Sequence, residues 1–287
     1  MFNSVIIAYR NRPQCLKALL RSLLLASSKA KDPYEVIISD LKSTSSSRNV
    51  FKNYEQTPLN LKVLSNKYSG HFWKSKALNN AARHAKGEFL TMIDVDSVVN
   101  HNFFSSTESF FSDKKNRKTK LAYRVFYLSP IVSRIVHKKS AKFDSNFLDK
   151  HIWNKKNTYS KARERYTGRE SFLCNIAKSQ HKIVMKDAAL GNSHFTMKKK
   201  FYMDIGGYDE RFIGHGLEDL DFNLRLWRHL HSGTLRPELE HAIFHLSHNK
   251  EGDWFTNSMR IQNRKIYREN KRKHKVFIPM GKDWGVF

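Results

Sequence analysis

The fold class of this chain is decided by the stretch Gly87-Glu88-Phe89-Leu90-Thr91-Met92-Ile93-Asp94-Val95-Asp96-Ser97. Its apolar run, Phe89 to Ile93, is bounded by a glycine and by polar residues, which is typical of a buried strand. Two carboxylates, Asp94 and Asp96, follow where α/β sheets bind their ligands. Because a strand alternates its faces, both would point the same way if the strand continued. Such a pair suits Mg²⁺ or Mn²⁺, and a solvated turn is the alternative.

Upstream of this stretch, apolar runs alternate with helical patterns. The predicted strands are Ser4 to Ala8, Tyr34 to Ser39 and Leu61 to Leu64. Leucines at helical spacing from Leu16 to Leu24 predict an amphipathic helix that starts near Pro13, and Ser75 to Lys86 predicts a second helix. The alternation predicts right-handed βαβ units and a mainly parallel sheet, with a nucleotide at the C-terminal ends of the strands.

Charged residues follow the first two of these strands. Arg10 and Arg12 come after the first strand and could reach a diphosphate, although surface arginines are common in a chain this basic. Asp40 ends the second strand, where it would accept a hydrogen bond from a ribose hydroxyl or a base, or cap a helix.

An acidic segment in the C-terminal half offers a second group of carboxylates. The glycine pair at Gly206-Gly207 marks a turn, and Gly214-His215-Gly216 leads into a helix that begins near Leu217. Glu218 and Asp219 lie in its first turn, where the helix dipole favours acids in any protein. The functional alternative is that one of them faces the crevice and acts as a general base.

The run from Ala242 to His248 predicts a strand that places His245 at its end. His245 and His248 are three residues apart, so in an extended segment they would not share a face. One of the two could complete a metal site with Asp96, although most histidines in proteins are not ligands.

The remaining segments carry charge rather than motifs. Basic clusters among aromatic residues fill residues 106–190, where only Tyr123 to Leu128 predicts a strand; they indicate either a contact with an anionic acceptor or membrane, or a solvated face. A basic helix near Phe255 to Lys273 could lie on an anionic membrane. The apolar tail after Val276 could pack on the core or help to anchor the protein.

Composition limits the class of protein. The 287 residues include 52 Lys and Arg against 26 Asp and Glu, a formal net charge of +26, which attracts polyanions of any kind. No nucleic-acid-binding signature accompanies the charge, so no specific nucleic acid is expected. The chain has two cysteines, no apolar run near 18 residues and no charged leader, which predicts a cytoplasmic protein. If the protein binds a membrane, we expect it to be peripheral on the cytoplasmic face.

Taken in order, these features resemble nucleotide-sugar-dependent glycosyltransferases of the GT-A fold, family 2 in type. The C-terminal half is similar to the β-1,4-galactosyltransferase and polypeptide N-acetylgalactosaminyltransferase group. The resemblance covers roughly residues 3–104 and 188–250. It rests on Ile7-Ala8-Tyr9-Arg10-Asn11-Arg12, Lys76-Ala77-Leu78-Asn79-Asn80-Ala81, Asp94-Val95-Asp96, Gly206-Gly207-Tyr208-Asp209-Glu210, Gly214-His215-Gly216-Leu217-Glu218-Asp219-Leu220-Asp221 and His245.

The resemblance implies an α/β fold in which a Rossmann-like nucleotide-binding sheet, with helices on both faces, is fused to a C-terminal acceptor-binding portion. Within one compact catalytic domain it divides the chain into four parts. These are a nucleotide-sugar-binding half at 1–105, a basic insertion at 106–190, a catalytic and acceptor half at 191–250, and a basic helix with an apolar tail at 251–287.

The resemblance also implies the site residues. Those that line the donor pocket are Ala8, Tyr9, Arg10, Arg12, Asp40 for the uracil, Lys76, Asn79, Asp94 for the ribose and metal, Val95, and Gly191, which lets the donor sugar approach the backbone. Asp96 would hold the metal, with His245 or His248 as a further ligand. Asp219 would be the catalytic base, and Glu218 would orient the sugar or acceptor. The arginine that the family often places before Asn79 is absent, which points to Lys76 as the cation.

The activity implied is inverting transfer of a hexose or N-acetylhexosamine from a UDP-sugar, with Mn²⁺ or Mg²⁺, to a glycan or lipid-linked oligosaccharide acceptor. Surface polysaccharide or oligosaccharide synthesis is the expected setting. Two alternatives stand beside it. A metal-dependent nucleotidyltransferase would also use paired carboxylates, but no glycine-rich triphosphate loop follows the first strand. A non-catalytic polyanion-binding protein would explain the charge, but not the acids at Asp94, Asp96, Glu218 and Asp219.

Overall fold

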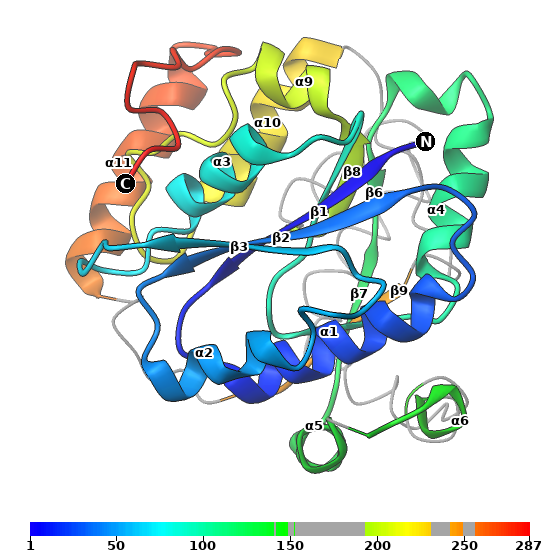
Figure 1. The fold of residues 1–287 in the computed structure, drawn as a ribbon. Coiled ribbons are helices and arrows are strands. Elements are labelled where there is room, and N and C mark those ends of the chain that lie inside the picture. Colours follow the sequence, from blue (N-terminus) through cyan, green and yellow to red (C-terminus); the bar gives the residue numbers. More distant parts are fainter. Residues whose placement is uncertain (141, 149–151, 153–192, 231–241, 249–255) are drawn as a thin grey trace.

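A mixed sheet forms the centre of the protein, which we describe from a computed structural model (Figure 1). The structure describes residues 1–140, 142–148, 152, 193–230, 242–248 and 256–287. Among them, the central sheet has six strands in the order β3-β2-β1-β4-β8-β6. These strands are β1 (Asn3–Tyr9), β2 (Tyr34–Leu41), β3 (Leu61–Asn66), β4 (Phe89–Met92), β6 (Leu121–Ala122) and β8 (Phe195–Lys198).

The first four strands run parallel, and β8 runs against them. Strand β6 pairs antiparallel with β8, so it runs in the same direction as the first four. In the parallel part Ala8 of β1 lies opposite Ser39 of β2, and Ser4 lies opposite Leu90 of β4. Strand β8 pairs antiparallel with β4, with Met92 opposite Phe195. The predicted parallel sheet is therefore confirmed for the N-terminal strands, and their carboxyl ends meet at one edge.

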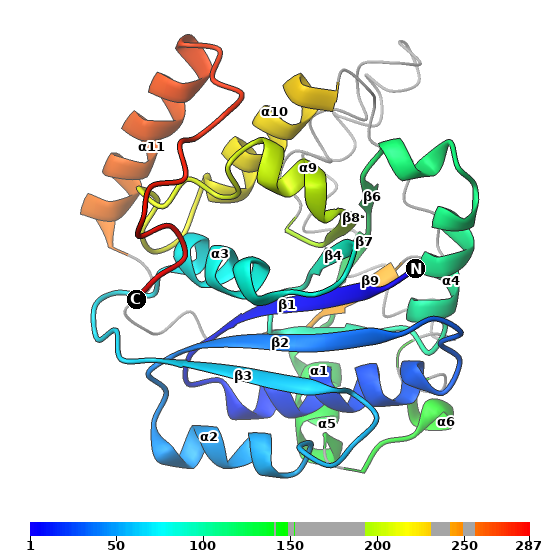
Figure 2. The same cartoon turned by 45° about the horizontal axis from the view of Figure 1, so that its top comes forward.

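Helices cover both faces of this sheet (Figures 1 and 2), as the α/β prediction requires. Successive residues of β1 feed two separate cores: Val5 and Ile7 pack on the side of α1 and α2, and Ile6 and Ala8 pack on the side of α3 and α10. The helices are α1 (Pro13–Ser27), α2 (Ser45–Lys52), α3 (Lys74–His84), α4 (Phe103–Ser112), η1 (Asn116–Lys118), α5 (Pro130–Lys139), α6 (Ser145–Leu148), α9 (Lys199–Asp204), α10 (Glu218–Leu230) and α11 (Asn257–Arg272).

A second sheet of three strands, in the order β5-β9-β7, stands beside the first. Its members are β5 (Ser97–Val99), β7 (Arg124–Tyr127) and β9 (Ala242–His245). Strand β9 pairs antiparallel with β5 in a register that puts His245 opposite Ser97. Leu246 also donates a backbone hydrogen bond of 2.7 Å to the carbonyl of Asp96. The register thus brings a histidine from late in the chain next to the acids that follow β4.

Some local predictions are corrected by the structure. The chain does not stay extended after β4, because Val95 and Asp96 form a turn before β5 begins at Ser97. Asp94 and Asp96 are therefore oriented by a turn and not by the alternation of a strand. After Asp40 the chain forms α2, and the side chain that caps the first turn of this helix is that of Thr44. Gly191 and, within the basic segment 106–190, residues 141, 149–151 and 153–190 lie outside the described residues.

The C-terminal tail packs on the core through Trp284, while other apolar residues of the tail, Phe277 among them at 49%, remain exposed. The Trp284 indole is 8% exposed and donates a 3.1 Å hydrogen bond to the carbonyl of Gly206. Asn80 of α3 donates to the carbonyl of Gly285 at 2.7 Å. Within the described ranges, no helix is long and apolar enough to cross a membrane.

Candidate active site

The turn after β4 sends its two acids into two neighbouring clusters. Asp94 forms an ion pair with Lys74, which also faces Glu218 and Asp219; we call these four residues the acid cluster. Asp96 faces Arg12, His245 and His248, which we call the histidine cluster. Both clusters lie at the carboxyl ends of the parallel strands, the edge where α/β sheets bind ligands.

The histidine cluster is centred on the carboxylate of Asp96. The Nε2 atom of His245 lies 3.4 Å from one oxygen of Asp96, and Nε2 of His248 lies 2.9 Å from the other. The Nη1 atom of Arg12 contacts that second oxygen at 2.6 Å and lies 3.2 Å from His248. Both histidines face the acid, because β9 ends at His245 and the chain beyond it is no longer an extended strand that would turn His248 to the other side.

The residues of this cluster fit a divalent cation. Ligand atoms of Asp96, His245 and His248 all lie within 4.8 Å of one another, and one carboxylate with two imidazoles is a donor set that Mn²⁺ accepts. Oδ1 of Asp96 and Nδ1 of His245 are buried without a hydrogen-bond partner. Burial raises the pKa of Asp96, but His245, His248 and Arg12 outweigh it and hold that pKa far below its usual range. The carboxylate is therefore ionised and able to ligate.

Lys74 is the centre of the acid cluster. Its ammonium group lies 3.0 Å from Asp94, 3.0 Å from Asp219 and 3.8 Å from Glu218. Lys74 is the first residue of α3, and its side chain is 11% exposed. Burial lowers the pKa of Lys74, but the three acids outweigh burial and raise it well above its usual value. Sequence reasoning missed Lys74, although its position two residues before Lys76, at the start of a predicted helix, was available.

The two carboxylates that share Lys74 have opposite pKa shifts. Burial, Glu218 and Asp94 raise the pKa of Asp219 to about 6, against the opposing effect of Lys74. Burial also acts on Asp94, but Lys74 and His194 outweigh it and lower the pKa to about 2. Asp219 additionally accepts a 2.8 Å hydrogen bond from the phenol of Tyr208. One acid thus remains ionised, while its neighbour is poised to take up a proton near neutral pH.

The loop before α10 positions Glu218 and Asp219. Leu217 has a φ of 74° and Gly216 a φ of 114°, so the chain reverses sharply at the start of the helix. The backbone N–H of Gly216 donates to Glu218 at 2.7 Å. Glu218 is 3% exposed. Its buried carboxylate therefore fixes the loop through this hydrogen bond and faces Lys74 of the acid cluster at 3.8 Å.

Lys76 and Asn79 do not join either cluster. The Lys76 ammonium lies 4.7 Å over the ring of Trp73 and 3.8 Å from Glu210. Asn79 is buried, and its amide donates to the carbonyl of Tyr208 at 2.9 Å and to Glu210 at 2.8 Å. These contacts tie α3 to the Gly206–Glu210 turn. The cation that faces the acids is therefore Lys74, and the contacts of Asn79 are those of a structural residue.

Other predicted nucleotide-pocket residues lie at the ends of β1 and β2 and in the turn after β4. Ala8 and Val95 are buried, and the Tyr9 hydroxyl donates to the carbonyl of Ser47 at 3.1 Å. Asp40 accepts from the N–H of Ser43 at 3.1 Å and lies 3.2 Å from Arg48.

Arg10, expected at the diphosphate, instead bridges loops. Its guanidinium donates to the carbonyl of Leu41 at 2.6 Å, to that of Gly70 at 2.6 Å and to that of Tyr68 at 3.1 Å. Arg12 is the arginine of this loop that reaches the clusters.

Two residues that sequence reasoning missed complete the site. The Ser193 hydroxyl donates to Asp94 at 2.5 Å, and the ring of His194 lies 2.8 Å from the hydroxyl of Ser97 and 4.0 Å from Asp94. Burial lowers the pKa of His194, with Asp94 opposing. Neither residue follows a recognisable motif, so only the pairing of β8 with β4 reveals them.

The fold and the site define a glycosyltransferase of the GT-A type. Residues 4–251 match the model of the glycosyltransferase like family 2, and the chain belongs to that family. Over 231 residues it is 26% identical to a hyaluronan synthase of Pasteurella multocida; this match covers 79% of the chain and 23% of that protein. The chain thus spans less than a quarter of the length of this relative.

Solved structures confirm the fold. The TarS fragment 1–349 of S. aureus, in complex with UDP-GlcNAc, superposes with a TM-score of 0.58 at 16% identity, over 88% of this chain and 60% of that one. The mannosyltransferase PcManGT of Pyrobaculum calidifontis, in complex with GDP-Man and Mn²⁺, superposes with a TM-score of 0.57 at 14% identity, over 96% and 65%.

Proposed function

We propose that this glycosyltransferase moves a hexose or N-acetylhexosamine from a UDP-sugar to a glycan acceptor, with inversion and with a divalent cation. The observation that carries the proposal is the meeting, at one sheet edge, of a carboxylate–imidazole cluster and a buried acid whose pKa is about 6. The acceptor is a surface polysaccharide or a lipid-linked oligosaccharide on the cytoplasmic face of a membrane.

Donor binding is assigned to the histidine cluster and the adjoining strand ends. Asp96, His245 and His248 would hold Mn²⁺ or Mg²⁺, and Asp94 follows the same strand, two residues before Asp96. A cation bound there would supply positive charge against the negative charge of the diphosphate. Arg12 is 25% exposed and presents a guanidinium group that can pair with phosphate oxygens.

The chemical step is assigned to the acid cluster. Asp219 accepts the proton of an acceptor hydroxyl as that oxygen bonds to the anomeric carbon; the bond from this carbon to the diphosphate oxygen breaks, and UDP leaves with the electron pair. Because the attack comes from the face opposite UDP, an α-linked donor gives a β-glycoside. Lys74 and Tyr208 fix the carboxylate of Asp219 through contacts at 3.0 and 2.8 Å.

Several finer points of the proposal rest on likeness. The roles of Glu218 and Asp219 follow the resemblance of the C-terminal half to the β-1,4-galactosyltransferase and N-acetylgalactosaminyltransferase group. The choice of UDP follows the UDP-GlcNAc complex of TarS, whereas PcManGT binds GDP-Man. The division into a donor half up to residue 105 and an acceptor half from 191 to 250 follows the positions of the two groups of site residues.

A donor panel tests the proposal. The protein is incubated with UDP-glucose, UDP-galactose, their N-acetylamino analogues and GDP-mannose, each with Mn²⁺ and without acceptor, and release of the free nucleotide is measured. We expect slow hydrolysis of one UDP-sugar that EDTA abolishes. Asp219→Asn should abolish transfer to an acceptor while UDP binding persists, whereas Asp96→Ala should lose Mn²⁺-dependent UDP binding. Full transfer activity in Asp219→Asn would exclude this base.

A further inference from the structure

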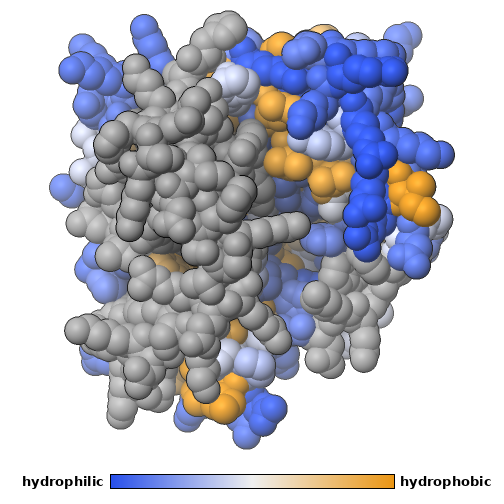
Figure 3. Space-filling model, turned by 180° about the vertical axis from the view of Figure 1, so that it is seen from behind, coloured by the Kyte–Doolittle hydropathy of each residue, from blue (hydrophilic) through white to orange (hydrophobic). Residues whose placement is uncertain are grey.

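Helix α11 presents a cationic face that the proposed reaction does not use. Its buried side is narrow and consists of Asn263, Ile266 and Asn270. Its outward side exposes Arg260, Arg264, Lys265, Arg268, Lys271 and Arg272, which we call the α11 face. Viewed from behind, a column of hydrophilic side chains runs along the edge where α11 lies, and a group of hydrophobic residues lies beside it (Figure 3).

Three arginines of this face form a regular row. Arg260, Arg264 and Arg268 recur every four residues, so neighbouring ones are about 6 Å apart along the axis. Among the described residues, none of these three forms an ion pair, while the Glu269 carboxylate is bound by Arg211 and Lys273. A row of exposed, fork-shaped cations matches an extended chain with repeated anionic groups.

The buried side of α11 supports the loop that leads to the catalytic acids. The Asn263 amide donates to the carbonyls of Ile213 and Gly216, both at 3.1 Å. Gly216 in turn donates to Glu218, the neighbour of Asp219. The α11 face is therefore one helix thickness from the loop at which the acceptor would enter.

The composition of the face decides between two kinds of polyanion. A helix that lies in a bilayer surface needs an apolar stripe to bury among the lipids. On α11 the one exposed apolar residue is Ile261, at 56%; Met259 and Tyr267 are half-buried, and Ile266 is buried in the core. A hydrated polyanion needs only the charges.

We infer that the α11 face binds a linear anionic polysaccharide, the extended part of the acceptor chain whose end enters beside Asp219. The binding itself depends only on the face, while its assignment to the acceptor rests on the proposed function. The occupant is a glycan with a carboxylate or another anionic group on its repeating units.

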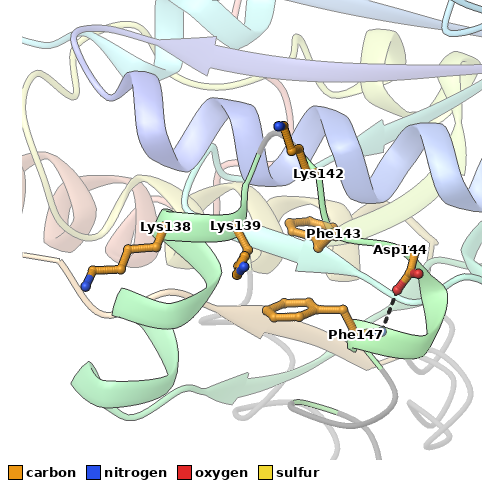
Figure 4. A pocket seen from close by; sticks show the side chains of 6 residues that line it. All are labelled: Lys138, Lys139, Lys142, Phe143, Asp144 and Phe147. Carbon is orange, nitrogen blue, oxygen red and sulfur yellow. Dashed lines mark hydrogen bonds between the residues drawn. The ribbon is translucent and has the colours of Figure 1, made fainter.

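A matched pair of variants tests this inference. R260Q/R264Q/R268Q removes three charges from the α11 face. The control, K138Q/K139Q/K142Q, removes three charges from a groove between α5 and α6 that Phe143, Asp144 and Phe147 also line (Figure 4). Both variants and the wild type are titrated with hexagalacturonate, with its methyl ester, and with vesicles of phosphatidylcholine and phosphatidylglycerol at 7:3. Thermal unfolding of each variant shows that it is folded.

We expect hexagalacturonate to bind the wild type and the control alike, and to bind the α11 variant about tenfold more weakly or worse; the uncharged ester should not bind. Equal losses in both variants would mean that net charge alone attracts the ligand, and the inference would fall. It would also fall if vesicle binding depended on the α11 arginines while hexagalacturonate binding did not. Saccharide binding without hydrolysis of any nucleotide sugar would leave the α11 face standing and remove the proposed function.

Discussion

At the scale of the residue, one lysine separates the roles of two acids. Lys74 lies 3.0 Å from both Asp94 and Asp219, yet the pKa of the first falls to about 2 and that of the second rises to about 6. Burial acts on both carboxyls, and the difference comes from their other neighbours: His194 and Ser193 beside Asp94, and Glu218 beside Asp219. A pair of acids with divergent pKa values is how enzymes assign ionised and proton-accepting roles.

The pH dependence of transfer follows from the raised pKa of Asp219. A base must be unprotonated, so the rate should rise with pH through about 6 and level off above it. Below pH 6 the rate should fall about tenfold per pH unit. Transfer rates between pH 4.5 and 8.5 measure this limb, and UDP binding over the same range separates it from donor affinity. A rate that is flat down to pH 4.5 would contradict the assignment.

Removal of the Lys74 charge should move the acidic limb of the pH–rate profile to higher pH. Lys74 lowers the pKa of Asp219, so Lys74→Met should shift the acid limb by about one pH unit or more toward alkaline pH. The thermal midpoint should also drop, because three acids lose their shared cation.

Lys76→Met is the matched control for this variant, since Lys76 contacts Trp73 and Glu210 instead of the acid cluster. It should leave the position of the limb unchanged. Lys74→Arg, which keeps the charge, should shift the limb less than Lys74→Met. An unmoved limb in Lys74→Met would show that Lys74 does not set the pKa of Asp219.

At the scale of the element, the glycine pair before Tyr208 receives the C-terminal tail. Gly206 has a φ of 77°, and a Cβ added to it would lie 1.8 Å from the carbonyl oxygen of Ile278. Ile278 also donates a backbone hydrogen bond to Ile205 at 3.1 Å. The turn thus joins the tail to α3 and α9, and it places Tyr208 where its hydroxyl reaches Asp219.

Gly206→Ala should therefore lower the free energy of unfolding by roughly 2 kcal/mol or more, since both the φ and the space exclude a side chain. Urea unfolding followed by tryptophan fluorescence measures the change. Gly281→Ala is the control, because nothing lies within 4 Å of the Cβ it would add. Equal urea midpoints for the two variants would contradict the packing of the tail.

At the scale of the whole molecule, the histidine cluster joins the two sheets. Asp96 lies between β4 of the central sheet and β5, and β9 contributes His245 through its pairing with β5, while Arg12 follows β1 of the central sheet. A ligand held by Asp96, His245 and His248 would therefore stabilise segments far apart in the sequence against separate unfolding.

Mn²⁺ should raise the thermal midpoint of the wild type. At a hundred times its dissociation constant, a ligand specific for the folded state adds about 2.7 kcal/mol, which corresponds to several degrees in a chain of this size. The variant H245A/H248A should show no such shift, while His274→Asn, which changes an exposed histidine on another surface, should behave like the wild type. Differential scanning fluorimetry with and without EDTA measures the shift. A similar shift in H245A/H248A would place the cation elsewhere.

The sequence alone determined the parallel βαβ frame, the ends of its strands and the residue types gathered there. Buried positions repeat every two residues in a strand and every 3.6 in a helix. The spacing of Val5, Ile7 and the leucines of α1 in the sequence therefore indicates which face of each element is buried. Only the tertiary structure showed that Lys74, and not Lys76, faces the acids. It also showed that Arg10 donates to backbone carbonyls and that both histidines contact Asp96. These choices depend on a turn at Val95 and on the pairing of Ser97 with His245 across almost 150 residues, and no local pattern encodes the register between strands so far apart.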